Sequence, residues 1–152
     1  MKLSSKISLR KANFSDIEFL WYLRNQPDVY KYFRQNRKIS WEEHIKWILP
    51  ILLGTSDKEI LIIQNPKLPV GQIRFDYKDF DISISLLKEF QGQGIAKRAL
   101  VLFIKKIKKQ KEFKYLSVQI HKKNLSSLKL FKKLGFRLKT KKGIWLRHIL
   151  KL

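Results

Sequence analysis

The sequence predicts a mixed α/β domain whose sheet is mostly antiparallel. Two amphipathic helical patterns come early in the chain, three β-rich runs follow them closely, and a long helical pattern then precedes a fourth run. Short turns join antiparallel strands, whereas strands joined through a helix run parallel. A chain of 152 residues, 44% of them hydrophobic, fits one domain over 1–152 without a linker.

The first part of the chain predicts a strand and two helices. Residues 6–12 alternate as a short strand does, and 13–25 have the helical period, with Ser15 as a plausible N-cap. A second helix is expected over 39–52. Its start has the capping-box spacing, in Ser40 and Glu43.

The middle of the chain predicts a three-strand antiparallel meander followed by a crossover. The three runs, 59–64, 70–77 and 80–87, are rich in β-branched and aromatic residues and are separated by turn residues. A long amphipathic helix over 95–110 then leads into the strand 114–121. The third run and this strand are therefore expected to be parallel neighbours.

The C-terminal part predicts one more helix and a strand pair. The segment 124–134 is a short helix that ends at Gly135, and the last two strands turn around Gly143. The order is β-α-α-β-β-β-α-β-α-β-β, which amounts to about six to seven strands and four helices.

Two of the six glycines, Gly92 and Gly94, lie between the third run and the long helix, in the sequence QGQGIAKR. Glycines before a helix N-terminus let the backbone N–H groups approach an anion, so this segment predicts a phosphate cradle. It lacks the Gly-Lys-Ser/Thr ending of a P-loop and the three glycines of a dinucleotide fingerprint, which disfavours ATP and NAD.

The glycine segment resembles the acyl-CoA loop of the GNAT superfamily of N-acyltransferases, through Gln91, Gly94 and Ala96. A segment farther along the chain resembles a second GNAT motif, with matches at Asn124, Ser127, Lys133, Gly135 and Phe136. The predicted element order is similar to that of the family along essentially the whole chain. The resemblance implies the GNAT fold, with a sheet that splays at the acyl-CoA site.

The resemblance also implies acetyl-CoA as co-substrate. No metal is expected, because the chain has no cysteine and its three histidines are scattered. Backbone groups of the third strand would hold the pantetheine arm of acetyl-CoA, and the amides of the glycine loop would hold its pyrophosphate. The residues expected to bind it are Leu86, Leu87, Gln91, Gly92, Gln93, Gly94, Ile95, Ala96, Lys97, Asn124 and Lys133.

The implied reaction is direct attack of a neutral primary amine on the thioester in one ternary complex, since the chain has no cysteine to carry an acyl group. A base must first take a proton from the amine. Asp81 lies where related enzymes keep an acidic residue, and its alternative role is a turn hydrogen bond. His121 is the second candidate base and His44 the third.

A departure from the family concerns the general acid. Many members place a tyrosine at the position of Phe131, which cannot donate a proton to the leaving thiolate. Members similar to the ribosomal-protein acetyltransferases use a serine three residues after the asparagine, and Ser127 takes that position. Its alternative role is a capping hydroxyl in the first helical turn.

The acceptor is predicted from the N-terminal helices. Their sequence resembles amino-sugar N-acetyltransferases of the pseudaminic acid pathway, which implies an amino sugar or a UDP-linked amino sugar as acceptor. The residues expected to bind it are Arg24, Asn25, Trp41 and His44. The nearest alternative is a protein N-terminal acetyltransferase of the ribosomal-protein type.

The net charge of +22 is concentrated in the C-terminal part, where the stretch from Lys88 onward holds 20 Lys and Arg against Glu89 and Glu112. Such an excess of positive charge is expected equally of a protein that binds an anionic ligand and of a protein from a lysine-rich proteome. A non-catalytic nucleic-acid-binding module is a further alternative, disfavoured because no recognisable nucleic-acid motif or aromatic platform accompanies the lysines.

The remaining expectations concern location and assembly. The longest apolar stretch falls far short of a membrane span, and the N-terminal segment lacks the apolar core of a signal peptide. We therefore expect a cytoplasmic protein with no membrane partner, either monomeric or homodimeric.

Overall fold

The computed structural model describes residues 6–152, and residues 1–5 of the predicted domain lie outside the described part. The strands are β1 (Ser8–Lys11), β2 (Lys58–Gln64), β3 (Pro69–Asp76), β4 (Asp81–Leu86), β5 (Tyr115–His121), β6 (Arg137–Lys142) and β7 (Trp145–Lys151). The helices are α1 (Ile17–Arg24), α2 (Pro27–Tyr30), α3 (Trp41–Leu52), α4 (Ile95–Lys108) and α5 (Leu125–Lys133). Two 3-10 turns complete the order: η1 (Phe14–Asp16) and η2 (Lys88–Phe90).

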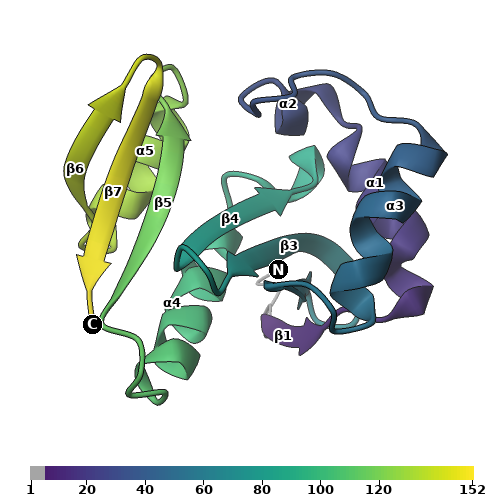
Figure 1. Ribbon diagram of the computed structural model, residues 1–152, viewed down its shortest axis with the longest axis horizontal. Coiled ribbons are helices and arrows are strands. Elements are labelled where there is room, and N and C mark those ends of the chain that lie inside the picture. The colour runs from purple at the N-terminus through teal and green to yellow at the C-terminus, as the bar shows by residue number, and fades with distance from the viewer. Residues whose placement is uncertain (1–5) are drawn as a thin grey trace.

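The seven strands form one sheet in the order β1-β2-β3-β4-β5-β7-β6. Every neighbouring pair is antiparallel except β4 and β5, which are parallel and share the single register pair Asp81 and Ser117. Beyond that pair the two strands diverge (Figure 1). The predicted mixed fold and its mostly antiparallel, splayed sheet are confirmed.

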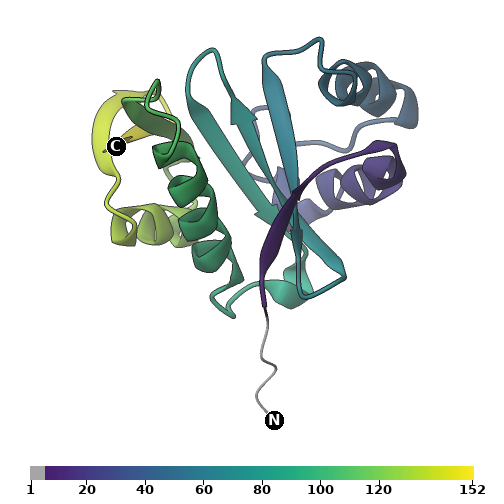
Figure 2. The same cartoon turned by 90° about the horizontal axis from the view of Figure 1, so that it is seen from below.

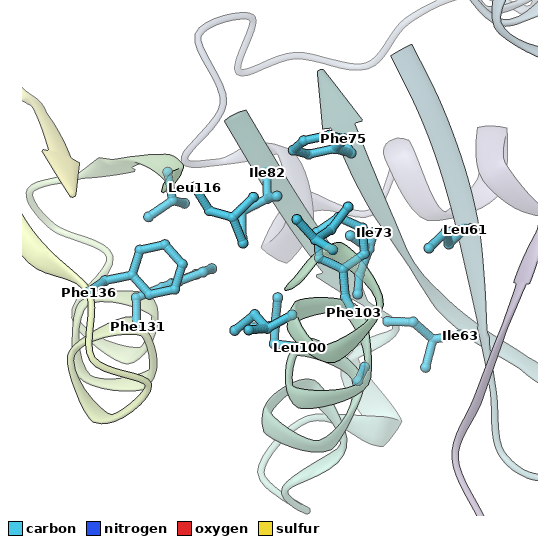
Figure 3. Close-up of a cluster of buried hydrophobic side chains, with 14 of the residues drawn as sticks. Leu61, Ile63, Ile73, Phe75, Ile82, Leu100, Phe103, Leu116, Phe131 and Phe136 are labelled. Atoms are coloured by element: carbon cyan, nitrogen blue, oxygen red, sulfur yellow. The ribbon is translucent and has the colours of Figure 1, made fainter. Parts of the chain in front are cut away.

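Helices cover both faces of the sheet. Figure 2 shows α4 and α5 on one side and α1 and α3 on the other. Ile73 and Phe75 of β3 pack with α4 in the larger core cluster, which continues to Phe131 and Phe136 at α5 (Figure 3). Alternate residues of β2, such as Ile62, pack in the smaller cluster beneath α1 and α3. The period-2 alternation of the strands thus separates the two layers.

The start of the first helix differs from the prediction of a Ser15 cap, which was wrong. Asn13 is the capping residue: its side chain accepts the Ser15 N–H at 2.9 Å, and Asp16 accepts the Asn13 N–H at 2.8 Å. A 3-10 turn therefore precedes α1, and Ser15 lies inside it. The capping box of Ser40 and Glu43 at α3 is confirmed.

Helix α2 was not predicted from the sequence. It has four residues and begins with Pro27, a residue that suits the first helical position because its missing N–H is not needed there. A single turn has no repeated apolar period that could reveal it.

The sheet has a polar surface where it faces the N-terminal helices. Register pairs place Gln72 opposite Ser85 and Arg74 opposite Ser83 on this face, and the alternation continues to Asp81. Because Ser117 pairs with Asp81, the polar row continues across the splay onto β5. The candidate site is built on this row.

Candidate active site

A cavity of about 990 Å³ opens where β4 and β5 separate. Its walls come from α1, α3, the α2–α3 segment (residues 31–40), the polar face of β3 and β4, the end of β5, and the starts of α4 and α5. The parallel pairing of β4 and β5 ends after Asp81, so the cavity lies between two strand edges. Such an edge offers backbone donors and acceptors that no neighbouring strand uses.

The start of α4 forms one end of the cavity. Gly92 and Gly94 have φ values of +76° and +78°, the left-handed region that favours glycine, and Gly94 is the N-cap. Within the described chain, the backbone N–H groups of Ile95, Ala96 and Lys97 have no protein acceptor. Free N–H groups at the positive end of a 14-residue helix are suited to a phosphate group.

The glycine loop is tied to both sides of the cavity through Gln91. Its side-chain amide donates to the Leu86 carbonyl at 3.0 Å and to Asp28 Oδ2 at 2.8 Å. Asp28 belongs to α2, so this side chain fixes the loop against both β4 and the N-terminal helices.

The edge of β4 that faces the splay carries the backbone groups of Ile84 and Leu86. The Leu87 N–H donates to the Val70 carbonyl at 2.9 Å, toward β3, and successive residues of a strand point these groups to opposite sides. The prediction that Leu86 and Leu87 both present backbone groups to the splay therefore needs a correction. Ile84 replaces Leu87, because only the sheet register decides which residues face the open edge.

Asp81 lies at the closed end of the splay. Ser117 Oγ lies 3.1 Å from Asp81 Oδ1, and the Ser117 N–H donates to the Phe80 carbonyl at 2.8 Å. Burial raises the pKa of Asp81 to about 6, although the hydrogen bond from Ser117 and the charge of Arg74 act in the opposite direction. A carboxyl group with this pKa is a base near neutral pH and can still accept and release a proton.

Phe80, immediately before Asp81, has a φ of +56°, which is uncommon for a bulky residue. Its ring lies edge-on to Phe113 at 5.5 Å and to Tyr115 at 5.2 Å, between ring centroids. These contacts, with the hydrogen bond to Ser117, hold the turn that places Asp81.

His121 lies at the opposite end of β5. Its Nδ1 accepts the Lys123 N–H at 3.0 Å, and its ring lies between Tyr32, at 5.2 Å, and Trp145, at 5.4 Å. Tyr32 comes from the α2–α3 segment, so His121 joins the N-terminal part of the chain to the C-terminal strands across the mouth of the splay.

The second predicted motif forms the start of α5. The Asn124 side chain accepts the Ser127 N–H at 3.3 Å and caps the helix. The Ser127 hydroxyl lines the cavity and makes no hydrogen bond within residues 6–152. Phe131 also lines the cavity but is only 1% exposed and packs on Phe136 in the core.

Residues 6–137 match the family described as "Acetyltransferase (GNAT) domain". The chain belongs to the GNAT acetyltransferase family.

Similar proteins include an uncharacterized protein of Methanocaldococcus jannaschii, which is 33% identical over 148 residues. That match covers 91% of this chain and 29% of the relative, so the GNAT chain spans less than a third of that relative's length. A solved domain from M. jannaschii DSM 2661 is 26% identical, with a TM-score of 0.86 and coverage of 98% and 100% of the two chains.

Spermidine N-acetyltransferase from Vibrio cholerae, solved with CoA and spermine, has a TM-score of 0.85. It is 14% identical, and the match covers 96% of the GNAT chain and 95% of that chain. A likeness at this identity shows the fold alone.

Several of the predicted CoA and acceptor residues lie outside the cavity lining that the described residues form. They are Leu87, Gln93, Lys133, Asn25 and Trp41. The Gln93 amide donates to the Glu89 carbonyl at 2.9 Å, and the Trp41 ring packs edge-on against Trp21. The side chains of Gln93 and Trp41 therefore make their contacts within the domain itself.

Two predicted acceptor residues at the C-terminal end of α1, Arg24 and its C-cap Asn25, shape the α2–α3 segment. Arg24 donates to the carbonyls of Gln35 and Arg37, both at 2.9 Å. Asn25 donates to the Ile39 carbonyl at 3.0 Å and accepts the Ile39 N–H at 2.9 Å. Arg24 also lines the cavity, whereas Asn25 acts only through the segment that it holds.

Three buried polar atoms in the cavity have no hydrogen-bond partner in the described chain. They are His44 Nδ1, Gln72 Oε1 and Ser85 Oγ, in residues that are 1%, 8% and 7% exposed. His44 Nε2 lies 2.9 Å from the Ile17 carbonyl, which makes Nε2 the donor and leaves Nδ1 as an acceptor. Burial lowers the pKa of His44, so the neutral ring is favoured.

Gln72 and Ser85 were not predicted as site residues from the sequence. A buried polar atom without a partner is rare in native proteins and indicates a site that a ligand or water completes. Only the strand alternation, read with the correct register, could have placed the two residues opposite each other.

Within residues 6–152, no group of three or more His, Cys, Asp or Glu is placed to hold a metal ion. In the same part of the chain, no helix is both long and apolar enough to cross a membrane.

Proposed function

We propose that the domain is an acetyl-CoA-dependent N-acetyltransferase that acts on the primary amine of an amino sugar, free or nucleotide-linked. The observation that carries the proposal is that one cavity is lined both by the glycine cradle of α4 and by the partly buried carboxyl group of Asp81. The cradle suits the phosphates of CoA, and Asp81 suits the removal of a proton from an amine.

The reaction begins when Asp81, directly or through a water molecule, takes a proton from the acceptor ammonium group. The neutral amine then attacks the thioester carbonyl carbon, and a C–N bond forms. The N–H groups on the open edge of β4, at Ile84 and Leu86, are the candidate donors to the oxygen that becomes negative. The nitrogen then loses its second proton, through water, toward the leaving thiolate and the C–S bond breaks, which gives the amide and free CoA once the thiolate is protonated.

Protonation of the thiolate is assigned to Ser127, whose hydroxyl lines the cavity without a hydrogen-bond partner in the described chain. Phe131 takes the position of the family tyrosine and has no proton to give. His121 keeps its role as the second candidate base. Its Nδ1 accepts the Lys123 N–H, which places the proton of the neutral ring on Nε2, so His121 can act as a base only if that hydrogen bond is broken.

The choice of an amino sugar is supported by the unpartnered polar atoms of His44, Gln72 and Ser85. All three can accept hydrogen bonds, so they match an acceptor with several hydroxyl groups. A site that is built to bond hydroxyl groups discriminates strongly against molecules without them, because its buried polar groups then stay unpaired.

The test begins with calorimetric titration of acetyl-CoA into the purified protein, with ADP and a short nucleic acid as separate titrants. Thiol release is then measured with glucosamine, a UDP-linked amino sugar, spermidine and a short peptide. We expect acetyl-CoA to bind and the sugars to be acetylated, and Ser85→Ala to raise the sugar KM with little change in kcat.

Other outcomes would favour the alternatives. Acetylation of the peptide with no activity on sugars would replace the proposal with the protein N-terminal acetyltransferase. Binding of nucleic acid without binding of acetyl-CoA would favour the non-catalytic nucleic-acid module.

A further inference from the structure

A second cavity, of about 540 Å³, lies beside the first and shares Arg34, Asp81 and Gln119 with it. Arg34 reaches it from the α2–α3 segment, and Arg147 reaches it from β7. Register pairs place Arg147 opposite Gln119, which also lines this cavity. Segments far apart in the sequence therefore bring two arginines to one space next to the candidate base.

Both guanidinium groups lie over aromatic rings. Arg34 is 4.5 Å from the ring centroid of Trp145, and Arg147 is 6.0 Å from that of Tyr115. Stacking on a ring positions a guanidinium group and leaves its N–H donors available at the edge. The two arginines are thus held in place before a ligand binds.

Neither arginine is paired with an acid within residues 6–152. The ion pairs of the described chain join Arg10 with Asp16, Arg37 with Glu43, Lys58 with Asp76 and Lys106 with Glu59. No other ion pair or hydrogen bond involves Arg34 or Arg147 there. Their donors match a phosphate or carboxylate group, which guanidinium binds in a bidentate manner.

The charged lining of this cavity has both signs. Arg34, Lys78 and Arg147 are cationic, and Asp79 and Asp81 are anionic. The complement of such a lining is a molecule with an ammonium group for Asp81 and an anionic group for the arginines. A polyamine, which has only positive charges, would meet three cations there.

We infer that the acceptor is an amine that also carries an anionic group, phosphate or carboxylate, which Arg34 and Arg147 bind in the second cavity. This inference rests on the proposed acetyltransferase function and narrows its substrate class. It distinguishes the acceptor from that of the Vibrio cholerae enzyme, whose name specifies spermidine. An amino-sugar phosphate and a nucleotide-linked amino sugar both belong to the inferred class.

The experiment uses protein saturated with CoA, so that the cradle at α4 is already filled, and titrates it with inorganic pyrophosphate, malonate or spermidine by calorimetry. We expect an anion to bind and its affinity to fall by about tenfold or more in Arg34→Ala and Arg147→Ala, as loss of a charge-assisted pair predicts. Arg147→Lys keeps the positive charge but loses the bidentate guanidinium group, so its anion affinity should lie between those of the wild type and Arg147→Ala. Tighter binding of pyrophosphate would indicate that the anionic group of the acceptor is a phosphate, and tighter binding of malonate would indicate a carboxylate.

The matched control is Arg137→Ala, an exposed arginine of β6 outside both cavities. It should leave anion affinity unchanged, and CoA affinity should stay unchanged in every variant that folds. Three results would overturn this inference and leave the proposed function standing. They are equal anion binding by the wild-type protein and both alanine variants, no anion binding at all, and binding of spermidine that is tighter than that of either anion. Failure to bind CoA at all would instead overturn the proposed function.

Discussion

Ser117 Oγ lies 3.1 Å from Asp81 Oδ1 at the one register pair that β4 and β5 share. The same contact therefore closes the splay of the sheet and positions the candidate base. A hydrogen bond that favours the charged carboxylate also opposes the rise in pKa that burial causes. The fold and the reactivity of Asp81 depend on the same pair of side chains.

The first prediction concerns the pH dependence of turnover. Since burial raises the pKa of Asp81 to about 6, kcat/KM should rise with pH through about 6 as the carboxyl group loses its proton. Ser117→Ala removes a bond to the carboxylate form, so the rise should move to higher pH. Asp81→Asn should lower kcat/KM by about 10²-fold or more. The measurement is a pH profile of thiol release.

His121→Gln is the control for this profile. It should keep the rise near pH 6, because that rise belongs to Asp81. A profile in which Asp81→Asn retains the rise and His121→Gln loses it would transfer the base to His121.

The second prediction concerns stability. The pKa of Asp81 is raised from 3.8 to about 6 on folding, so between these values the folded state binds more protons than the unfolded state. Stability is therefore lost as pH rises through this range. Asp81→Asn cannot lose a proton and should be more stable than wild type above about pH 6, by up to about 3 kcal/mol.

Urea unfolding at two pH values checks this prediction. The difference between Asp81→Asn and wild type should nearly vanish at about pH 3, which is below both pKa values, so that folded and unfolded Asp81 are both largely protonated. If Asp81→Asn differed from wild type in free energy of unfolding by the same amount at both pH values, the effect would come from packing and not from the charge.

The third prediction concerns the glycine cradle. Gly94 has φ +78°, and Gly54, far from the cavity, has φ +76°; a Cβ at either position would meet nothing within 4 Å. Valine at either site should cost a similar conformational strain, about 1–2 kcal/mol. Only Gly94→Val should also weaken acetyl-CoA binding, by about tenfold or more, because the side chain and the altered backbone disturb the N–H groups at α4.

Calorimetry on both variants measures this difference. If Gly54→Val lost the same affinity, the effect would be a general consequence of strain. If Gly94→Val kept the wild-type affinity, the phosphate cradle would have to be placed elsewhere.

The fourth prediction concerns Ser127. Ser127→Ala should lower kcat by about 10²-fold, the lower end of the range of acid catalysis, and leave the affinity for acetyl-CoA unchanged. Ser126→Ala is the matched control, since Ser126 is the exposed neighbour and donates to Asn124 Oδ1. Steady-state kinetics that leave kcat unaltered in Ser127→Ala would assign the proton transfer to water.

Most of the fold could be predicted from local patterns. The strands β2 to β5 and the helix α4 have clear periods over at least six residues each, and Gly92, Gly94 and Gly135 mark turns that require positive φ. The local patterns failed where an element was one turn long, as in α2, or where two side chains competed for one cap, as Asn13 and Ser15 did.

The sequence by itself determined the order of the seven strands and of the helices other than α2, and the glycine turn before α4, because these depend on residues close together in the chain. The resemblance to the family added Asp81 and Ser127 as candidates. Only the tertiary structure decided that Ile84 and not Leu87 faces the splay, and that Gln72 lies opposite Ser85. It alone brought Arg34 to the same cavity as Arg147. The reason is physical: strand register and the packing of distant segments are fixed by the whole core, and a shift of one residue would turn each of these side chains to the other face.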